Sequence, residues 1–383
     1  MTQEKERLDD SEDEITEEGS EEKSGMKIEN PVVREAGLYQ SDGSFIPWDD
    51  LGLDVERDYY EDKGRPSNVF GDNGYDGRLV LPDTITSIGI NAFAGCPSLI
   101  SIDFPNTITS IGAGAFYKCP SLTSIDLSNT QLKNSSSIGQ DAFSDCTSLT
   151  SIRLPDIMTS IGDAFIGCTS LTSIEFPDTL TSIDGTFRDC TSLTSIRLPD
   201  TLENIYDPAF MGCTSLTSID LSNTQLTWTG EGTFIGCTSL TSVELPDTVT
   251  VIGSDAFSGC TSLTSIELPD AVTDIRKNAF YECTSLTSIN LSNTQLTSIE
   301  EEAFADCTSL TSIELPATFR GMTIGYDPFS NCNSLKNLNY AGTMEEWNNI
   351  VNSDDWDRLD KAAPFGRSSS IETITCSDGV ITR

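Results

Sequence analysis

Two sets of side chains recur along this chain at regular spacing and could carry chemistry. The first is a column of eleven cysteines that follow one another at intervals of 22 to 27 residues. They are Cys96, Cys119, Cys146, Cys168, Cys190, Cys213, Cys237, Cys260, Cys283, Cys307 and Cys332. Thiolates form disulfides and ligate soft metals, so such a column could be a disulfide ladder or a metal–thiolate wire.

The spacing favours a structural role for these thiols. No Cys-x-x-Cys pair occurs in the sequence. Cysteines that recur once per coil would point the same way on strands about 4.8 Å apart, a geometry that suits a disulfide badly. A buried cysteine packs as a small hydrophobic residue, so we interpret the column as part of an apolar interior. Cys376 lies outside the column and could be free or capping.

The second set is a mostly acidic column between the Ile and the Leu of each repeated Leu-Thr-Ser-Ile-x-Leu segment. Its members are Asp103, Asp126, Arg153, Glu175, Arg197, Asp220, Glu244, Glu267, Asn290 and Glu314. Arg153, Glu175 and Arg197 alternate in sign and can pair across strands. Asp220, Glu244 and Glu267 place like charges side by side and should repel unless a basic protein surface or weakly held divalent cations bind. The alternative, which we favour, is a solvated acidic face that maintains solubility.

Trp228 is the one residue inside a repeat that clearly departs from the repeated sequence pattern. In the alignment with Ser298 and Ile299, Trp228 replaces the serine and Thr229 replaces the inward isoleucine. Trp228 is either an exposed aromatic anchor for a partner or the product of a local register shift that turns the indole into the core. We favour the core interpretation because it also explains Thr229.

Composition argues against several functions. The chain has 60 acidic and 22 basic residues, a formal charge of −38, so no basic patch is expected to bind nucleic acid. It contains no histidine, which rules out Ser-His-Asp and Cys-His catalysis. The carboxylates belong to a regular column with no pocket expected to raise one pKa selectively. We therefore expect a protein that is not an enzyme and that binds no cofactor.

Both columns require a repeated element to position them. Leu171, Ile174 and Phe176 follow the spacing of a parallel strand whose alternate residues enter the core. A Pro-Asp-Thr turn follows, and Leu180 and Ile183 place a second apolar pair one face further round the coil. The Ala-Phe pair that comes next predicts a short helical or 3₁₀ turn. Glycine follows the second isoleucine in several units and suggests a positive φ there: Gly89, Gly112, Gly162 and Gly253.

The period divides the chain into four parts. Residues 1–30 form an acidic tail expected to be disordered, because they are rich in Glu and lack aromatic residues. Residues 31–77 read as an N-terminal cap with two short strands around a Ser-Asp-Gly turn, and 78–340 hold about eleven repeats. Residues 341–383 are expected to form a C-terminal cap with a strand or two and a Trp-bearing helix.

A period of this length predicts a leucine-rich-repeat solenoid, and the unit Leu-Thr-Ser-Ile-x-Leu-Pro-Asp-Thr-Leu-Thr-Ser-Ile-Gly-x-x-Ala-Phe-x-x-Cys closely resembles the BspA-like, or Treponema-type, subclass of these repeats. The resemblance implies a right-handed coil or horseshoe with a parallel sheet on its concave face. It also implies roles in surface attachment, matrix-protein binding or co-aggregation, and it brings no catalytic residues to carry over.

The expected function is a non-enzymatic adhesion or protein-interaction scaffold, monomeric, whose acidic column and Trp228 contact a protein or glycan partner. The alternative is a spacer or assembly component of a cell envelope or phage without a specific ligand. No apolar run long enough for a membrane span or a secretion signal occurs, so we expect no membrane insertion. The resemblance points to the cell surface, whereas the missing signal leaves the cytoplasm possible.

Overall fold

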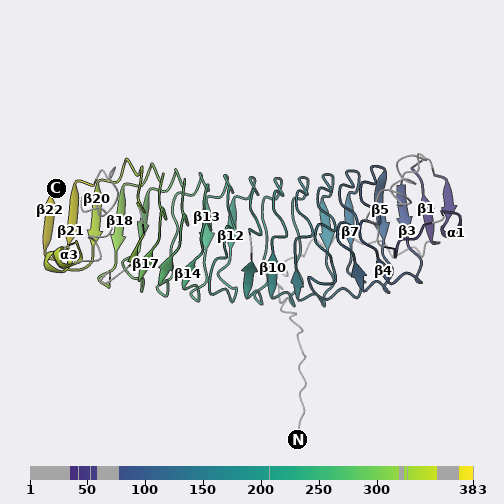
Figure 1. Ribbon diagram of the computed structural model, residues 1–383, viewed down its shortest axis with the longest axis horizontal. Helices are drawn as coiled ribbons and strands as arrows, with labels where there is room; N and C mark the ends of the chain where they lie inside the picture. Colours follow the sequence, from purple (N-terminus) through teal and green to yellow (C-terminus); the bar gives the residue numbers. More distant parts are fainter. Residues whose placement is uncertain are drawn as a thin grey trace, which may run out of the picture. The chain divides into compact units, whose positions relative to one another are not determined.

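The computed structural model describes residues 35–41, 43–51, 53–57, 77–206, 208–318, 323–325, 327–351 and 371–382. The prediction for the acidic tail lies outside these residues. The chain from Glu35 onward forms one compact unit. Its coils follow one another from β1 at one end to β22 at the other (Figure 1), as expected for a repeat solenoid.

The first strands of the coils build a parallel ladder that is interrupted at residues 265–268. Ser101, Ser124 and Ser151 pair in register, as do the isoleucines that follow them. The strands are β3 (Gly77–Val80), β5 (Leu99–Asp103), β7 (Ser124–Asp126), β8 (Ser151–Arg153), β12 (Ser218–Asp220), β13 (Ser242–Glu244), β16 (Ser288–Asn290), β18 (Ser312–Leu315) and β20 (Asn337–Tyr340). Single bridges at Glu175 and Arg197 join β8 to β12. The isoleucines point inward and the residues on either side point out, as the alternation predicts.

The Thr-Ser-Ile segment of each coil builds a second parallel ladder on another side of the solenoid. Its strands are β4 (Ser87–Ile88), β6 (Ser110–Ile111), β9 (Ser160–Ile161), β10 (Ser182–Asp184), β11 (Asn204–Tyr206), β14 (Val251–Ile252), β15 (Asp274–Ile275), β17 (Ser298–Ile299) and β19 (Thr323–Ile324). The sequence analysis predicts an apolar pair in this segment, such as Leu180 and Ile183, but no β-sheet. Because the isoleucines of successive coils align, their backbones pair as well.

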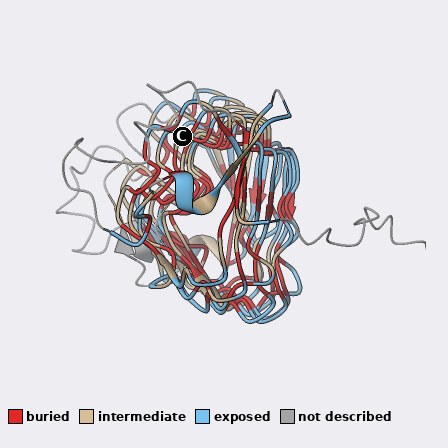
Figure 2. Ribbon diagram, turned by 90° about the vertical axis from the view of Figure 1, so that its right-hand side faces the viewer, coloured by how far each residue is buried: buried red, intermediate tan, exposed pale blue. Residues whose placement is uncertain are grey.

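A stack of phenylalanine rings fills the space between the two ladders. Eleven rings lie with neighbouring centroids 5.1–6.1 Å apart and planes within 12° of parallel. They belong to Phe93, Phe116, Phe143, Phe165, Phe187, Phe210, Phe234, Phe257, Phe280, Phe304 and Phe329. Seen along the coils, buried segments lie on the inner side of the outline (Figure 2). The stack is continuous, so each ring is part of the interior of two adjacent coils.

The segment around each phenylalanine is a series of short turns, as expected, whose bonds join residues three apart as in a 3₁₀ turn. In the first unit the amide of Ala94 donates to Asn91 O, and that of Cys96 donates to Phe93 O. Asn91 and Gly95 adopt positive φ and break any continuous helix. The residue before every cysteine of the column has φ between 56° and 73°: Gly95, Lys118, Asp145, Gly167, Asp189, Gly212, Gly236, Gly259, Glu282, Asp306 and Asn331.

The glycines after the second isoleucine do not adopt the positive φ that we predicted. Gly89, Gly112, Gly162 and Gly253 are all absent from the left-handed region. A Cβ on Gly112 would lie 2.5 Å from Ile90 N, and one on Gly253 would overlap Gly230 O. Glycine is required at these two positions because the backbone of the preceding coil comes too close for a side chain.

A matched pair of substitutions tests this explanation. We expect Gly253→Ala to lower the free energy of unfolding by about 1–3 kcal/mol, because the coils must separate to admit the methyl group. Gly162 occupies the equivalent position, but its Cβ would meet only Ser135 Cβ at 3.5 Å. Gly162→Ala should therefore leave stability unchanged or raise it by up to about 1 kcal/mol. Urea denaturation followed by circular dichroism measures both; equal losses would contradict the explanation.

Both ends of the ladder carry antiparallel strands. At the first end, β1 (Gly37–Tyr39) pairs with β2 (Phe45–Pro47) as the expected hairpin and joins β3, and the short helix α1 (Trp48–Leu51) follows. At the other end, β20 is followed by α3 (Met344–Val351), β21 (Thr373–Cys376) and β22 (Gly379–Thr382). Thr343 caps α3, since its hydroxyl accepts from the amide of Glu346 while the Glu346 carboxylate accepts from the amide of Thr343. Trp347 of α3 is buried.

Candidate functional site

The cysteine column is explained by a hydrogen bond that crosses from coil to coil. Each thiol from Cys119 to Cys332 donates to the carbonyl oxygen of the phenylalanine in the preceding coil, with Sγ–O distances of 3.0–3.4 Å. Cys119, for example, donates to Phe93 O at 3.0 Å. All twelve cysteines lie in the described part of the chain, where they are buried and form no disulfide, so the structure supports the structural interpretation of the column.

Burial determines the ionisation of these thiols. It raises the pKa of Cys168, Cys190, Cys213, Cys237, Cys260 and Cys283. For Cys190, Cys237 and Cys283 the pKa reaches about 12. A thiolate is the nucleophile and the metal ligand, so these groups are inert at neutral pH. Among the residues that the structure describes, no three Cys, Asp or Glu side chains gather closely enough to hold a metal ion.

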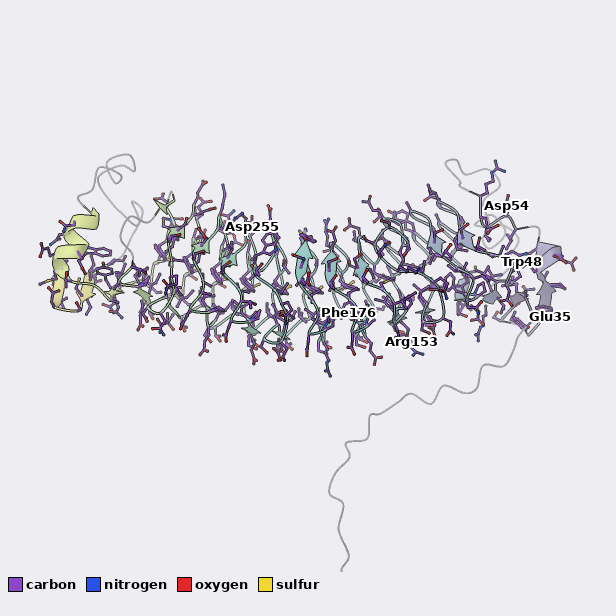
Figure 3. The ribbon with its side chains drawn as sticks, turned by 90° about the horizontal axis from the view of Figure 1, so that it is seen from below. Glu35, Trp48, Asp54, Arg153, Phe176 and Asp255 are labelled. Atoms are coloured by element: carbon purple, nitrogen blue, oxygen red, sulfur yellow. The ribbon has the colours of Figure 1, made fainter. Side chains whose placement is uncertain are left out.

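The charged column lies on the outer surface of the first ladder, as predicted. Neighbouring members are paired in register from Asp103 through Glu244, and Asn290 pairs with Glu314 further along. Figure 3 shows Arg153 at one edge of the ribbon and Asp255, from the turns before the phenylalanines, at the other. The column therefore forms one continuous outward row, apart from the position of Glu267.

Positive charge is confined to the first half of this row. Arg78 of β3 forms an ion pair with Asp103, and Arg153 lies 3.6 Å from Asp126. The Arg78–Asp103 pair is half-buried, whereas the Arg153–Asp126 pair is exposed and contributes little to stability. From Asp220 to Glu314 the row contains no Lys or Arg. The second half is therefore the part whose negative charge a cationic partner could neutralise.

Three members of the row have a local structural task that the sequence analysis missed. Asp220 accepts hydrogen bonds from the Ser222 amide at 2.9 Å and the Ser222 hydroxyl at 2.6 Å. The hydroxyl bond, then the amide bond, lowers the pKa of Asp220. Asp126 and Asn290 bind Ser128 and Ser292 in the same way. The signal was present, because only these three units have Ser-Asn where the others have Pro, which has no amide to donate.

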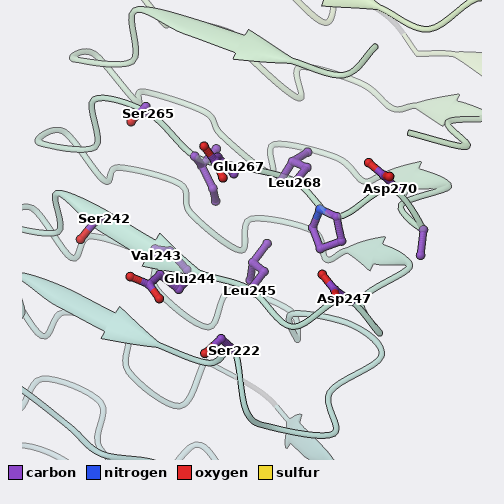
Figure 4. Close-up of a pocket in the computed structure, with 13 residues that line it drawn as sticks. Ser222, Ser242, Val243, Glu244, Leu245, Asp247, Ser265, Glu267, Leu268 and Asp270 are labelled. Carbon is purple, nitrogen blue, oxygen red and sulfur yellow. The ribbon is translucent and has the colours of Figure 1, made fainter. Parts of the chain in front are cut away.

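A groove opens where the first ladder is interrupted. It has a volume of about 850 Å³. Its walls come from β13 and the turn after it, and from residues 265–271 of the next coil. Figure 4 shows Glu244 and Glu267 near the middle of the groove and Asp247 and Asp270 at one end. The structure thus gathers two carboxylates of the predicted acidic run, Glu244 and Glu267, with two that we did not single out. Asp220 lies outside the lining, which includes Ser222.

Trp228 does not belong to this face, and our preferred interpretation of it was wrong. The register is unchanged: Thr229 takes the inward position and is buried, and its hydroxyl accepts from the Gly253 amide at 2.9 Å. Trp228 is half-buried on the outside of the second ladder, where it pairs with Val251 and packs against the exposed ring of Tyr206 at 6.5 Å. A buried hydroxyl that bonds two coils replaces the isoleucine, so no shift is needed.

The threonines beside the strands also have a structural role. Their hydroxyls donate to backbone oxygens of the preceding coil, as Thr150 does to Thr123 O at 3.0 Å and Thr241 to Thr217 O at 2.9 Å. These bonds reinforce the stacking of the coils. The groups that remain available to a ligand on this face are the charged side chains of the row and exposed serines such as Ser242 and Ser265.

Comparison with known proteins adds a family profile and several solved structures. The profile described as BspA type Leucine rich repeat region matches residues 66–184, 162–249 and 227–355. A leucine-rich repeat protein from Bacteroides ovatus is 26% identical, with 80% of this chain and 85% of that chain covered and a TM-score of 0.53. A leucine rich cell surface protein from Faecalibacterium prausnitzii is also 26% identical, with 79% and 88% covered and a TM-score of 0.47.

The pneumococcal vaccine antigen PcpA is 16% identical, with 79% of this chain and 80% of that chain covered and a TM-score of 0.47. No curated protein sequence matches. In the part of the chain that the structure describes, no helix has the length and apolar character needed to cross a bilayer.

Proposed function

Because this chain belongs to the BspA-type leucine-rich repeat family, we propose that it is a non-enzymatic interaction scaffold that binds a protein or glycan partner through the outward row of its first ladder. The observation that supports this proposal is that inward and outward side chains have separate roles. The thiols and most of the inward groups hold coil to coil, and the row of charged residues from Asp103 to Glu314 projects from regular backbone. A rigid, evenly spaced array of this kind favours recognition of a large ligand.

The family resemblance further suggests adhesion at a bacterial cell surface. We propose this location together with the binding role. Fractionation of native cells, followed by probing of intact and opened cells with an antibody against the repeats, tests it. Detection on intact cells is expected, and a signal that appears only after the cells are opened would overturn the location and leave the binding proposal standing.

The binding role is tested with two charge-neutralising variants of the row, applied to arrays of cell-surface proteins and glycans. The first variant changes the alternating half: Arg153→Gln, Glu175→Gln and Arg197→Gln. The second changes the acidic half: Asp220→Asn, Glu244→Gln and Glu267→Gln. We expect at least one variant to weaken capture of a ligand by about tenfold or more, the effect of losing one or two charge-assisted contacts.

The matched control removes three charges from the turns before the cysteines: Asp145→Asn, Asp189→Asn and Asp306→Asn. Asparagine tolerates the positive φ at these positions, so the fold should be retained and capture unchanged. If neither row variant weakens capture, and deletion of two whole coils is tolerated by the cell, the protein acts as a spacer and the proposal is wrong.

A further inference from the structure

Two aromatic side chains lie together on the outer surface of the second ladder. In the described structure β11 pairs with β10 on one side only, and the next coil contributes Trp228, which bridges to Val251. The ring centroids of Tyr206 and Trp228 are 6.5 Å apart, and their planes are tilted by 59°. Unlike the parallel rings of the phenylalanine stack, these two rings do not cover each other's faces. Tyr206 is 44% exposed and Trp228 is half-buried.

The repeat does not require an aromatic residue at either position. The register runs from Trp228 through the next two coils to Ser298, so Trp228 stands where a regular unit has serine. Tyr206 pairs with Asp184 of the preceding coil, so its position also accepts a polar residue. The core is complete without the two rings, because the inward residues Ile205 and Thr229 are buried. Stacking of the coils therefore gives no reason for this aromatic pair, whereas a ligand would.

Uncharged hydrogen-bonding groups accompany the two rings. Asn204 and Tyr206 are the two outward residues of β11, on either side of a buried isoleucine. The Asn204 amide, the Tyr206 hydroxyl and the Trp228 indole N–H make no side-chain hydrogen bond to another described residue. They offer both donors and acceptors. The site therefore combines two aromatic faces with neutral polar groups that a ligand could engage.

Size and charge select the class of ligand. The exposed surface of the two rings is on the order of 100–200 Å², far below the roughly 1,000 Å² of a specific protein–protein interface. Asp184 and Asp274 lie at neighbouring positions of the same ladder, and the chain carries a formal charge of −38, so anionic ligands are repelled. A small neutral ligand with an apolar face and polar edges fits these conditions.

A pyranose sugar has this chemistry. When its hydroxyls are equatorial, as in glucose, both faces of the ring present C–H groups, which carry partial positive charge and are attracted to the negative face of an aromatic ring. Its hydroxyls lie at the edge, where an amide can donate to one and accept from another.

We infer that Tyr206, Trp228 and Asn204 form a binding site for a neutral oligosaccharide of glucose-configured pyranose units. The sugar faces pack on the two aromatic rings, and the sugar hydroxyls form hydrogen bonds with the Asn204 amide. This inference goes beyond the proposed function, because the site lies on the second ladder and outside the charged row.

The ligand side of the test uses the full chain in calorimetric titrations. The probes are the tetramers of β-1,4-linked glucose and of β-1,4-linked N-acetylglucosamine. We expect at least one to bind with a Kd on the order of 0.1–1 mM and with no dependence on salt, since the ligand is neutral. The tetramer of β-1,4-linked glucuronic acid should bind about tenfold more weakly or not at all. Absence of binding by both neutral tetramers up to about 10 mM would overturn the inference.

On the protein side, Trp228→Ser and Tyr206→Ala should each weaken binding of the neutral tetramer by about tenfold or more. Asn204→Ser should weaken it by about threefold. Serine stands at the matching positions of Ser298 and Ser182, so the fold should be retained, as circular dichroism can verify. The matched control is Tyr281→Ala, which removes a half-buried tyrosine from the turns after the phenylalanines and should leave binding unchanged. Equal weakening by this control would contradict a defined site.

The two proposals fail separately. The row variant with Asp220→Asn, Glu244→Gln and Glu267→Gln should leave tetramer binding intact. If that variant abolishes tetramer binding while Trp228→Ser does not, the row holds the sugar and the inference is wrong. Displacement of the tetramer by a ten-residue lysine–valine peptide would also overturn it, because the site would then receive a peptide. If the tetramer binds as expected and no row variant weakens array capture, only the proposed function fails.

Discussion

Raising the pH above about 9 is expected to unfold the solenoid through its thiols. An unfolded cysteine loses its proton near pH 8.5, whereas the folded protein holds the protons of Cys190, Cys237 and Cys283 up to a pKa of about 12. Between these values the unfolded state binds fewer protons than the folded state. The free energy of unfolding therefore falls as pH rises, by about 1.4 kcal/mol per pH unit for each buried thiol.

The effect is large because the thiols are many. With six thiols whose pKa burial raises, the fall is roughly 8 kcal/mol per pH unit, comparable to the whole stability of an ordinary domain. Stability should be independent of the thiols below about pH 8, and the unfolding midpoint should lie near about pH 10. Circular dichroism across the titration, with a phosphine reductant present, measures it.

A single-cysteine variant provides the control. Cys237→Ala removes one titrating group, so the slope of unfolding free energy against pH should be smaller by about 1.4 kcal/mol per pH unit, whatever the substitution costs at pH 7. An unchanged slope would mean that the thiols do not control alkaline unfolding.

Truncating a ring in the middle of the phenylalanine stack is expected to produce the largest effect of any single substitution. Phe210 is fully buried and stacks on Phe187 at 5.9 Å and on Phe234 at 5.7 Å. Phe210→Ala should lower the free energy of unfolding by about 3–5 kcal/mol, from lost burial and the cavity left behind. Because each coil contacts only its neighbours, the two halves should also become less coupled, and unfolding should broaden or split into two transitions.

Phe176 supplies a control of the same residue type. It is half-buried and touches Phe187 edge-on at 5.7 Å, outside the stack. Phe176→Ala should cost clearly less than Phe210→Ala and leave a single transition. Urea denaturation of both variants, followed by circular dichroism and tryptophan fluorescence, compares them. Similar losses for the two would indicate that stacking between coils adds nothing to burial.

The positions that repeat most strictly could be predicted from the sequence. Ile125 and Ile152 point inward from the first ladder, Phe187 fills the centre of its coil, and Cys190 follows it, all as their spacing implies. These predictions hold because burial of an apolar residue once per coil leaves few alternatives. The second ladder was missed because a strand such as β10 has one inward residue, Ile183, with no apolar residue two positions on to show alternation.

The left-handed positions were assigned to the wrong column for an identifiable reason. Glycine can indicate a positive φ or a close backbone approach, and at Gly112 and Gly253 it is the approach that requires it. The left-handed column before the cysteines holds Gly, Asp or Asn in nine of its eleven units, with Lys118 and Glu282 as the exceptions. That composition is the residue preference of the left-handed region, so it was available in the sequence.

The candidate site could be predicted only in part. The outward row of acids follows from the alternation of the strand, but the interruption at residues 265–268 does not, because the unit Leu-Thr-Ser-Ile-Glu-Leu-Pro-Asp is the ordinary one. Glu244 and Glu267 were named correctly as neighbours, whereas the loss of pairing between their backbones depends on how adjacent coils settle against each other.

The bond from each thiol to the phenylalanine of the preceding coil has a consequence for how such a molecule can change in length. Every unit presents the same carbonyl to its successor and the same sulfur to its predecessor. A duplication or loss of one whole unit would thus leave each junction chemically satisfied. Recombination within the gene could therefore lengthen or shorten the protein by whole coils. The segments that cover the two ends of the solenoid would stay intact.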